Sequence, residues 1–301
     1  MSDAASKIPQ NIDELLRWST QFLTAKGFQT ARLDSELLLA KVLDCRRIDL
    51  YLRFDQPMSK AELSSYKSLL LRRLNHEPVA YILGYKDFMD LRFEVDKSVL
   101  IPRPETELLV ERILEFFKNR EEEDLRIFEI GSGSGCIGIT LLNSLKNAKL
   151  LAWDISQAAV NLSSLNARKC QIESSRYQFQ VRDALDEKSW IGLQNFDIIV
   201  SNPPYIAIEE REQLPSSVAL FEPGQALFAH EEGLSFYRLF AKLARYHLHE
   251  TGKMFVEIGS NQAVAVSSIL NFYGWQDVLI KKDYARHDRI VEGAYSGNKT
   301  E

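Results

Sequence analysis

The four residues Asn202-Pro203-Pro204-Tyr205 directly follow an apolar run over residues 196–201 that predicts a buried strand. Pro203 and Pro204 cannot donate backbone hydrogen bonds and have a fixed φ, so the turn is stiff. A stiff turn can direct the Asn202 carboxamide and the Pro203 carbonyl toward one point, and two such acceptors suit a planar NH2 group. Tyr205 offers a flat face on which that group can stack. The motif therefore predicts a clamp for an amide or aromatic amine, which indicates methyl transfer to nitrogen.

A glycine-rich loop follows the strand predicted at residues 127–130, with the sequence Gly131-Ser132-Gly133-Ser134-Gly135. Glycines permit positive φ and close approach of the backbone to a ligand. At the carboxyl end of a strand in an open α/β sheet, such a loop lies where ligands bind. Asp154 ends the next predicted strand, 150–154, and its carboxylate can accept hydrogen bonds from both hydroxyls of a ribose.

The segment after the third predicted strand, 177–181, adds a possible adenine contact. Asp183, followed by Ala184, fits a group that contacts the adenine amine, although an Asp at this place can also cap a helix or turn. We expect both residues to belong to the cofactor site.

The glycines alone leave two cofactors open. Gly133, Gly135 and Gly138 also satisfy G-x-G-x-x-G, a fingerprint of nicotinamide dinucleotide binding, and that cofactor carries an adenosine ribose as S-adenosylmethionine does. The Asn-Pro-Pro-Tyr clamp decides between them, because hydride transfer needs no amine clamp. The sequence therefore predicts S-adenosylmethionine as methyl donor, S-adenosylhomocysteine as product, and no metal.

Helix capping signals mark the first 75 residues as a small helical bundle. Asn11 with Glu14 resembles a capping pair, and Ser59 with Glu62 forms a capping box. Asp34 is predicted to cap a further helix between them.

Residues 79–100 change in character, because Tyr81, Ile82 and several later residues favour strands and Gly84 and Asp90 are turn signals. We expect a helical domain over residues 1–76, a β-hairpin linker over 77–100 and a larger domain over 101–301.

Strand and helix patterns alternate in the larger domain. Strands are predicted at 127–130, 150–154, 177–181, 196–201 and 253–258, and a helix at 105–117. This alternation predicts an α/β fold with a parallel sheet covered on both faces. Residues 275–282 and 289–295 form two final strands without a helix between them. Such a terminal antiparallel pair is typical of the Rossmann-like sheet of class I methyltransferases.

Composition places the chain among soluble globular proteins. The 301 residues are 45% hydrophobic and 26% charged, no apolar run is long enough for a membrane helix, and the polar start, residues 1–10, predicts no export signal. Three widely spaced cysteines indicate neither a disulfide framework nor a zinc site, so a cytoplasmic location is expected. The net charge is +2 over residues 1–78 and −7 over the remainder, which disfavours tight binding to nucleic acid.

The chain resembles the bacterial protein-(glutamine-N5) methyltransferases of peptide-chain release factors, the PrmC/HemK family, over nearly its whole length. The glycine loop and Asn202 to Tyr205 are shared with adenine methyltransferases. The subfamily is indicated by Glu77 to Gly84, by the segment Leu100-Ile101-Pro102-Arg103-Pro104-Glu105-Thr106-Glu107, and by later matches at 222–223, 226–228 and 233–238.

This resemblance implies that the helical domain helps to dock a class 1 release factor and that residues 101–301 form the S-adenosylmethionine-dependent methyltransferase domain. The implied acceptor is the Gln of the release factor's Gly-Gly-Gln loop, methylated in support of translation termination. Three departures from the family pattern concern the fine cofactor contacts: Glu129 in place of the commoner Asp, Ala184 in place of an aromatic residue, and Ala229-His230 in place of a glycine-rich pair.

Two other interpretations compete with this one. An N6-adenine methyltransferase would grip a flipped base in the same way, but would be expected to carry an added basic recognition region. A cofactor-binding regulatory module without turnover would not need an intact Asn202 and Tyr205. Neither direct nucleic-acid binding nor membrane binding is expected.

Overall fold

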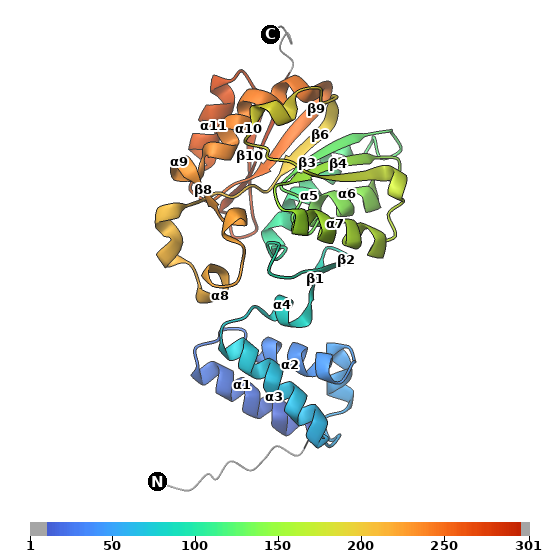
Figure 1. Cartoon of the computed structure of the whole chain (residues 1–301), viewed down its shortest axis with the longest axis vertical. Helices are drawn as coiled ribbons and strands as arrows, with labels where there is room; N and C mark the ends of the chain where they lie inside the picture. Colours follow the sequence, from blue (N-terminus) through green and yellow to red (C-terminus); the bar gives the residue numbers. More distant parts are fainter. Residues whose placement is uncertain (1–10, 296–301) are drawn as a thin grey trace. The chain divides into compact units, whose positions relative to one another are not determined.

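The computed structural model describes residues 11–295, so the polar start at residues 1–10 lies outside the described part. The chain divides into two compact units, Met1–Gly84 with Ser216–Phe221, and Tyr85–Pro215 with Glu222–Glu301. We call them the helical unit and the α/β unit (Figure 1). None of the helices formed by residues 11–295 combines the length and apolarity needed to cross a bilayer.

The helical unit consists of α1 (Ile12–Ala25), α2 (Ala31–Val42), η1 (Arg47–Leu52), α3 (Lys60–Leu74), α4 (Val79–Leu83) and the short α8 (Ser216–Ala219). The predicted caps of α1 and α3 are confirmed. Asn11 Oδ1 accepts from the Glu14 N–H at 2.9 Å, and Ser59 and Glu62 form a reciprocal capping box.

The prediction that Asp34 caps the second helix is wrong. Helix α2 begins at Ala31 after Thr30, so Asp34 lies inside its first turn. Asp34 is buried and accepts from Arg73 Nε at 2.7 Å, joining α2 to α3. An ion pair between helices therefore explains an acidic residue that sequence alone presented as a cap.

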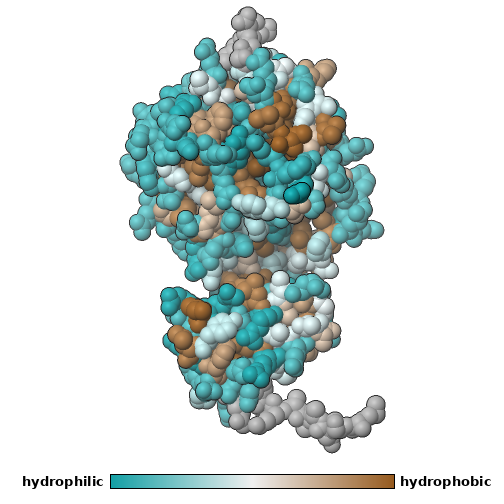
Figure 2. Space-filling model, turned by 180° about the vertical axis from the view of Figure 1, so that it is seen from behind, coloured by the Kyte–Doolittle hydropathy of each residue, from teal (hydrophilic) through white to brown (hydrophobic). Residues whose placement is uncertain are grey.

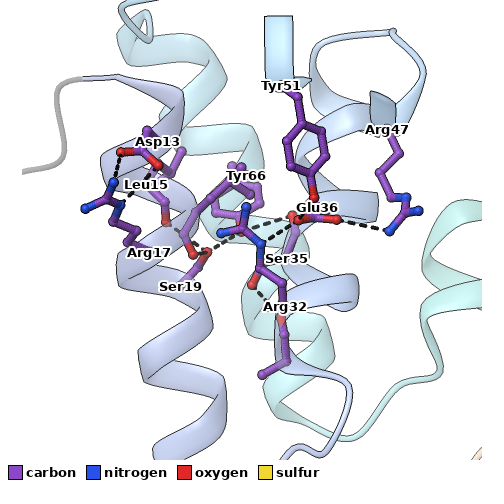
Figure 3. Close-up of polar contacts among 12 residues, drawn as sticks. Asp13, Leu15, Arg17, Ser19, Arg32, Ser35, Glu36, Arg47, Tyr51 and Tyr66 are labelled. Carbon is purple, nitrogen blue, oxygen red and sulfur yellow. Dashed lines mark hydrogen bonds and ion pairs between the residues drawn. The ribbon is translucent and has the colours of Figure 1, made fainter. Parts of the chain in front are cut away.

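A second buried carboxylate organises the surface of the helical unit (Figure 3). Glu36 on α2 accepts from Arg32 Nε at 2.5 Å, from the Tyr51 hydroxyl at 2.6 Å and from Arg47 at 3.2 Å. Nearby, the buried Tyr66 hydroxyl donates to Ser19 Oγ at 2.8 Å. Because each of these buried polar groups has a partner, the bundle avoids the cost of an unsatisfied group.

Residues 79–83 are helical, so the prediction of β structure at Tyr81 and Ile82 is wrong. Pro78 precedes this helix, α4, and Gly84 ends it with φ 85° in the left-handed region. These two residues set the ends of the helix, and burial of its side chains overrides their preference for strands. The predicted hairpin is confirmed further on, as β1 (Tyr85–Phe88) and β2 (Leu91–Glu94) in antiparallel pairing.

The α/β unit is built on a sheet that, within residues 11–295, has seven strands in the order β10-β11-β9-β6-β3-β4-β5. Their bounds are β3 (Arg126–Ile130), β4 (Lys149–Asp154), β5 (Tyr177–Val181), β6 (Phe196–Ser201), β9 (Leu248–Glu257), β10 (Gln276–Lys282) and β11 (Asp288–Ala294). The first five of these are parallel, and β11 pairs antiparallel with both β9 and β10. The predicted parallel sheet with a terminal antiparallel pair is confirmed.

Helices cover both faces of this sheet (Figure 1, green on one face and orange on the other). One core contains side chains of α5 (Pro104–Phe117), α6 (Cys136–Ser144) and α7 (Gln157–Lys169), and the other those of α10 (Ser235–Leu243) and α11 (Ala263–Phe272). Along β3, Ile127 enters the first core and Phe128 the second, as the period of two in a strand requires.

Short elements connect these layers: η2 (Ser174–Arg176), η3 (Glu187–Trp190), β7 (Ile206–Ala207), η4 (Ile208–Gln213), η5 (Gly224–Ala226), β8 (Phe228–Ala229), α9 (His230–Gly233) and η6 (Ala244–His247). On the face that Figure 2 shows, mostly hydrophilic residues cover the α/β unit, and apolar residues form separate patches between them.

A buried ion triad fastens α5 to the sheet. Glu292 on β11 is fully buried and accepts from Arg112 Nε at 2.6 Å and from Lys253 Nζ at 3.1 Å. Burial alone would raise the pKa of Glu292, but its hydrogen bonds to Arg112 and Lys253 hold that pKa below its ordinary value. The carboxylate therefore stays charged inside the protein.

Candidate active site

A cavity of about 300 Å³ opens at the carboxyl ends of β6, β3, β4 and β5. On one side of β3 lie β4 and β5, and on the other lie β6 and β9, so the strand order reverses between β3 and β6. Ligands of open α/β sheets bind at such a reversal, and the volume lies at the lower end of the roughly 300–1,000 Å³ of small-molecule sites. The lining includes most of the predicted site residues: Gly131, Ser132, Gly133, Ser134, Asp154, Asp183, Ala184, Asn202, Pro203 and Pro204.

The glycine loop connects β3 to α6 through positive φ angles. These are 77° at Gly131, 52° at Gly133 and 80° at Gly135, a region that favours glycine. At Gly135 a Cβ would also come within 2.7 Å of Ile139 Cδ1. Ser134 lies in the cavity wall and is itself buried.

Asp154 lies at the end of β4 and fixes the glycine loop. Its Oδ2 accepts from the Gly133 N–H and its Oδ1 from the Ser156 N–H, both at 2.8 Å. Burial raises the pKa of Asp154, while these two backbone donors act in the opposite direction. Each carboxylate oxygen keeps a further lone pair, so the side chain can still accept from the hydroxyls of a ribose.

Asp183 and Ala184 follow β5 and form a turn. Asp183 Oδ1 accepts from the Leu185 N–H at 2.8 Å, which is the turn-capping alternative, while the residue also lines the cavity. The Ala184 carbonyl accepts from Trp190 Nε1 at 3.0 Å, and its methyl group leaves part of the wall small and apolar. Contact of either residue with an adenine stays a prediction.

Glu129 is fully buried beneath the loop. Its Oε2 accepts from the Gly138 N–H at 3.2 Å, whereas Oε1 has no partner among the described residues. Burial raises the pKa of Glu129 to about 8, so the carboxyl is largely protonated at pH 7. A Cβ at Gly138 would lie 2.4 Å from Oε2, which explains a glycine at that position.

The carboxamide of Asn202 is held by a neighbour that the sequence did not identify. Asn202 Nδ2 donates to Thr106 Oγ1 at 3.1 Å, and Thr106 in turn donates to Glu257 Oε2 at 2.7 Å. No residue in the 11–295 range donates to Asn202 Oδ1 or to the Pro203 carbonyl, so both acceptors are available beside the cavity.

Tyr205 is not brought to the cavity lining with the rest of the clamp. Its ring packs against the second core, and burial raises its pKa to about 12, so the phenol is neutral. Its carbonyl accepts from Gln262 Nε2 at 3.0 Å, and a Cβ at Gly233 would lie 2.1 Å from the same oxygen. Gln262 and Gly233 thus hold the clamp loop from behind, and stacking by Tyr205 stays a prediction.

An ion pair secures the loop before α5. Arg103 donates to the buried carboxylate of Glu222 at 2.6 Å, and the Ile101 N–H donates to the same carboxylate at 3.3 Å. The sequence marks the segment 100–107 as a motif, but it does not show that Arg103 pairs with Glu222 and Thr106 with Glu257. Within residues 11–295 no group of three or more His, Cys, Asp or Glu side chains is placed to hold a metal ion.

Comparisons with known proteins add the wider context. Residues 14–84 match the family model of the PrmC N-terminal domain, and residues 104–224 match that of the methyltransferase small domain. The release factor glutamine methyltransferase of Geobacter sulfurreducens is 36% identical over 282 residues, which cover 94% of this chain and 96% of that protein. A bifunctional methyltransferase of Rickettsia prowazekii is 35% identical over 94% of this chain, which spans only 57% of that longer protein.

Among solved structures, the hMettl16 catalytic domain in complex with the MAT2A 3′UTR hairpin 6 is similar, with a TM-score of 0.55 and 16% identity over 80% of this chain and 83% of that one. At this identity the likeness concerns the fold alone. Together with the match to the methyltransferase small domain, it confirms the predicted Rossmann-like methyltransferase sheet.

Proposed function

Because this chain belongs to the family of release factor glutamine methyltransferases, we propose that it methylates the side-chain amide nitrogen (N5) of a glutamine in a peptide-chain release factor. The methyl donor of this proposal is S-adenosylmethionine, and the acceptor is the Gln of the release factor's Gly-Gly-Gln loop.

The position of Asn202 carries the proposal. Its carboxamide oxygen and the Pro203 carbonyl lie at the carboxyl end of β6, beside the cavity and next to the glycine loop. Two such acceptors, directed toward one point by the stiff turn, would match the two N–H hydrogens of a primary amide. Asn202 thus supports a site in which an amide nitrogen faces a bound methyl donor.

The main task of the protein in this reaction is to align the acceptor nitrogen with the methyl group. An amide nitrogen is a poor nucleophile because its lone pair is delocalised into the carbonyl, while S-adenosylmethionine supplies an activated methyl group on a sulfonium. Proximity and orientation can contribute roughly 7–11 kcal/mol at best. Asn202 Oδ1 and the Pro203 carbonyl would orient the nitrogen and stabilise the positive charge that develops on it. The proton can leave after transfer, so no strong base is required.

The residues around the cavity fit the proposed donor. Asp154 would accept from the ribose hydroxyls with its remaining lone pairs, and the backbone of residues 131–135 would lie against the amino acid part. Asp183 and Ala184 would flank the adenine.

Transfer of labelled methyl from S-adenosylmethionine to purified class 1 release factor tests the function directly, with duplex DNA as the competing acceptor. We expect label on the release factor and none on DNA, and mass spectrometry should locate it on the Gln of the Gly-Gly-Gln loop. Label on DNA alone would favour adenine methylation. Label on neither acceptor would favour a cofactor-binding module without turnover.

Asp154→Ala is expected to weaken binding of S-adenosylmethionine. Each hydrogen bond to a charged group is worth about 1.5–3 kcal/mol, so loss of one contact should raise Kd by roughly 10- to 150-fold. Calorimetry measures the change, and Asp154→Asn is the control because it keeps the shape and one acceptor oxygen for the Gly133 N–H. Tight binding of NAD to the wild-type protein, without binding of S-adenosylmethionine, would refute the cofactor assignment.

The helical unit is proposed to dock the release factor. Its core is separate, and residues 1–78 carry a net charge of +2 against −7 for the rest. Removal of residues 1–84 should leave the affinity for S-adenosylmethionine nearly unchanged while raising KM for release factor. Calorimetry and steady-state kinetics measure the two quantities. Equal methylation of release factor by the shortened and full-length proteins would contradict this role.

A further inference from the structure

Three polar groups from distant parts of the sequence, two of them buried, form one hydrogen-bonded network beside the cavity. Asn202 follows β6, Thr106 lies in the first turn of α5, and Glu257 is the last residue of β9. Thr106 and Glu257 are each 1% exposed. Asn202 Nδ2 is 3.1 Å from Thr106 Oγ1, which is 2.7 Å from Glu257 Oε2.

The number of protons on each group fixes the donor and the acceptor of each hydrogen bond in this network. An ionised carboxylate only accepts hydrogen bonds, so Thr106 must give its single hydroxyl proton to Glu257. Thr106 Oγ1 then has only lone pairs left for its other neighbour, and only the NH2 end of Asn202 can donate to it. The order NH2 to hydroxyl to carboxylate therefore leaves Asn202 Oδ1 as the acceptor facing a substrate amide.

We propose that Thr106 and Glu257 are positioning residues for methyl transfer, because together they select the one carboxamide orientation of Asn202 that can accept from the substrate nitrogen. The inference rests on the proposed function. It also assigns a task to the threonine of the segment 100–107, whose side chain points to the clamp through this contact.

The protonation state of Glu257 decides whether the direction holds. Burial raises the pKa of Glu257 to about 7, while the Thr106 hydrogen bond and Arg289 act in the opposite direction. A protonated Glu257 can donate to Thr106 Oγ1, which frees the Thr106 proton to turn toward Asn202. Asn202 Oδ1 can then accept from Thr106, and the productive orientation is no longer selected.

The other charged or titratable groups that act on Glu257 come from several elements. Tyr205, Tyr237 and Cys136 have pKa values raised to about 12 or well above their ordinary value, so they stay neutral near pH 7. Arg289 and Arg103 lower the pKa of Glu257 through their charges, and Glu105 raises it. Beneath the glycine loop, Glu129 also has a pKa of about 8, so only a variant of Glu257 itself can assign the pH effect.

Thr106→Val, which keeps the side-chain shape and removes the hydroxyl, is expected to lower kcat for purified release factor by roughly 10- to 100-fold, the order of loss that misplacement of a reacting group causes. KM for S-adenosylmethionine should stay near its wild-type value. Thr106→Ser restores the hydroxyl and should recover most of the lost kcat. The matched control is Thr140→Val, since Thr140 is also buried but its Oγ1 has no partner among the described residues.

The pH profile of kcat is the second readout. Wild-type kcat should fall as the pH decreases through about 7, the pKa of Glu257, because the carboxylate is the form that sets the direction. Glu257→Gln should show a lower plateau and no such fall. Wild-type kcat in Thr106→Val, equal losses in the Val and Ser variants, or an unchanged fall in Glu257→Gln would each overturn the inference. If the wild-type enzyme transfers no methyl to release factor, the proposed function itself fails instead.

Discussion

Asn202→Ala is expected to lower kcat for methylation of release factor by about 10²–10³-fold, the usual loss when one preorganised contact to a reacting group is removed. Thermal stability should stay nearly intact, because Asn202 is only partly buried and its side chain makes one hydrogen bond within residues 11–295, to Thr106. Single-turnover methylation isolates this step from product release. Mass spectrometry of the same reaction shows whether residual methyl still lands on the Gln of the Gly-Gly-Gln loop.

Asn202→Asp is the control that separates acceptance from orientation. The carboxylate still offers an oxygen to the substrate amide, but it has no N–H for Thr106 and lies near the second carboxylate of Glu257. Activity should therefore fall to a trace and not vanish. Near-normal turnover in Asn202→Ala, or methyl on a different residue, would show that the clamp is not the methyl-acceptor site.

The parts of the fold with strong local signals were predictable. Capping at Asn11 and Ser59 depends on residues three apart, and the strands of the α/β unit show as short apolar runs between helical patterns. The clamp and the glycine loop were also placed correctly at strand ends, because parallel strands bring their carboxyl ends to one edge.

The contacts that orient the site were not predictable, because they join distant residues. Thr106 and Glu257 lie 151 positions apart, and they meet only because α5 packs against β9. On sequence alone, Thr106 is a small polar residue in a first helical turn. The prediction that Asp34 caps a helix was wrong for the same reason, since its partner Arg73 lies 39 positions away.

Other departures have a local cause. Pro78, Gly84 and the burial of its side chains fix helix α4. The strand preferences of Tyr81 and Ile82, taken residue by residue, do not include these three effects. The direction of the Tyr205 ring depends on its packing against the second core and on the Gln262 contact to its carbonyl. The motif thus predicted residues that lie at the cavity, whereas tertiary packing decided which of their side chains line it.

Among the variants proposed for this protein, Glu292→Ala is expected to cause the largest decrease in the free energy of unfolding. The change would leave Arg112 and Lys253 without their shared carboxylate in a region where their side chains are only 17% and 7% exposed. Removing one partner of a buried ion pair typically costs about 3–5 kcal/mol. For a unit of this size, such a loss lowers Tm by roughly 6–20 °C. Calorimetric unfolding of the full chain measures both quantities.

The matched control is Asp87→Ala, which breaks an Arg–carboxylate pair of similar length in the same unit. Arg92 Nε lies 2.8 Å from Asp87 Oδ1, but the two side chains are 58% and 61% exposed, so the loss should be at most about 1 kcal/mol. Measuring the stability of the wild-type protein as a function of pH tests the same contribution. Because the folded pKa of Glu292 is depressed, its contribution is present above the ordinary value of 4.5 and is lost as the pH falls through the lower folded pKa. Equal losses in the two variants would mean that burial does not set the strength of the triad.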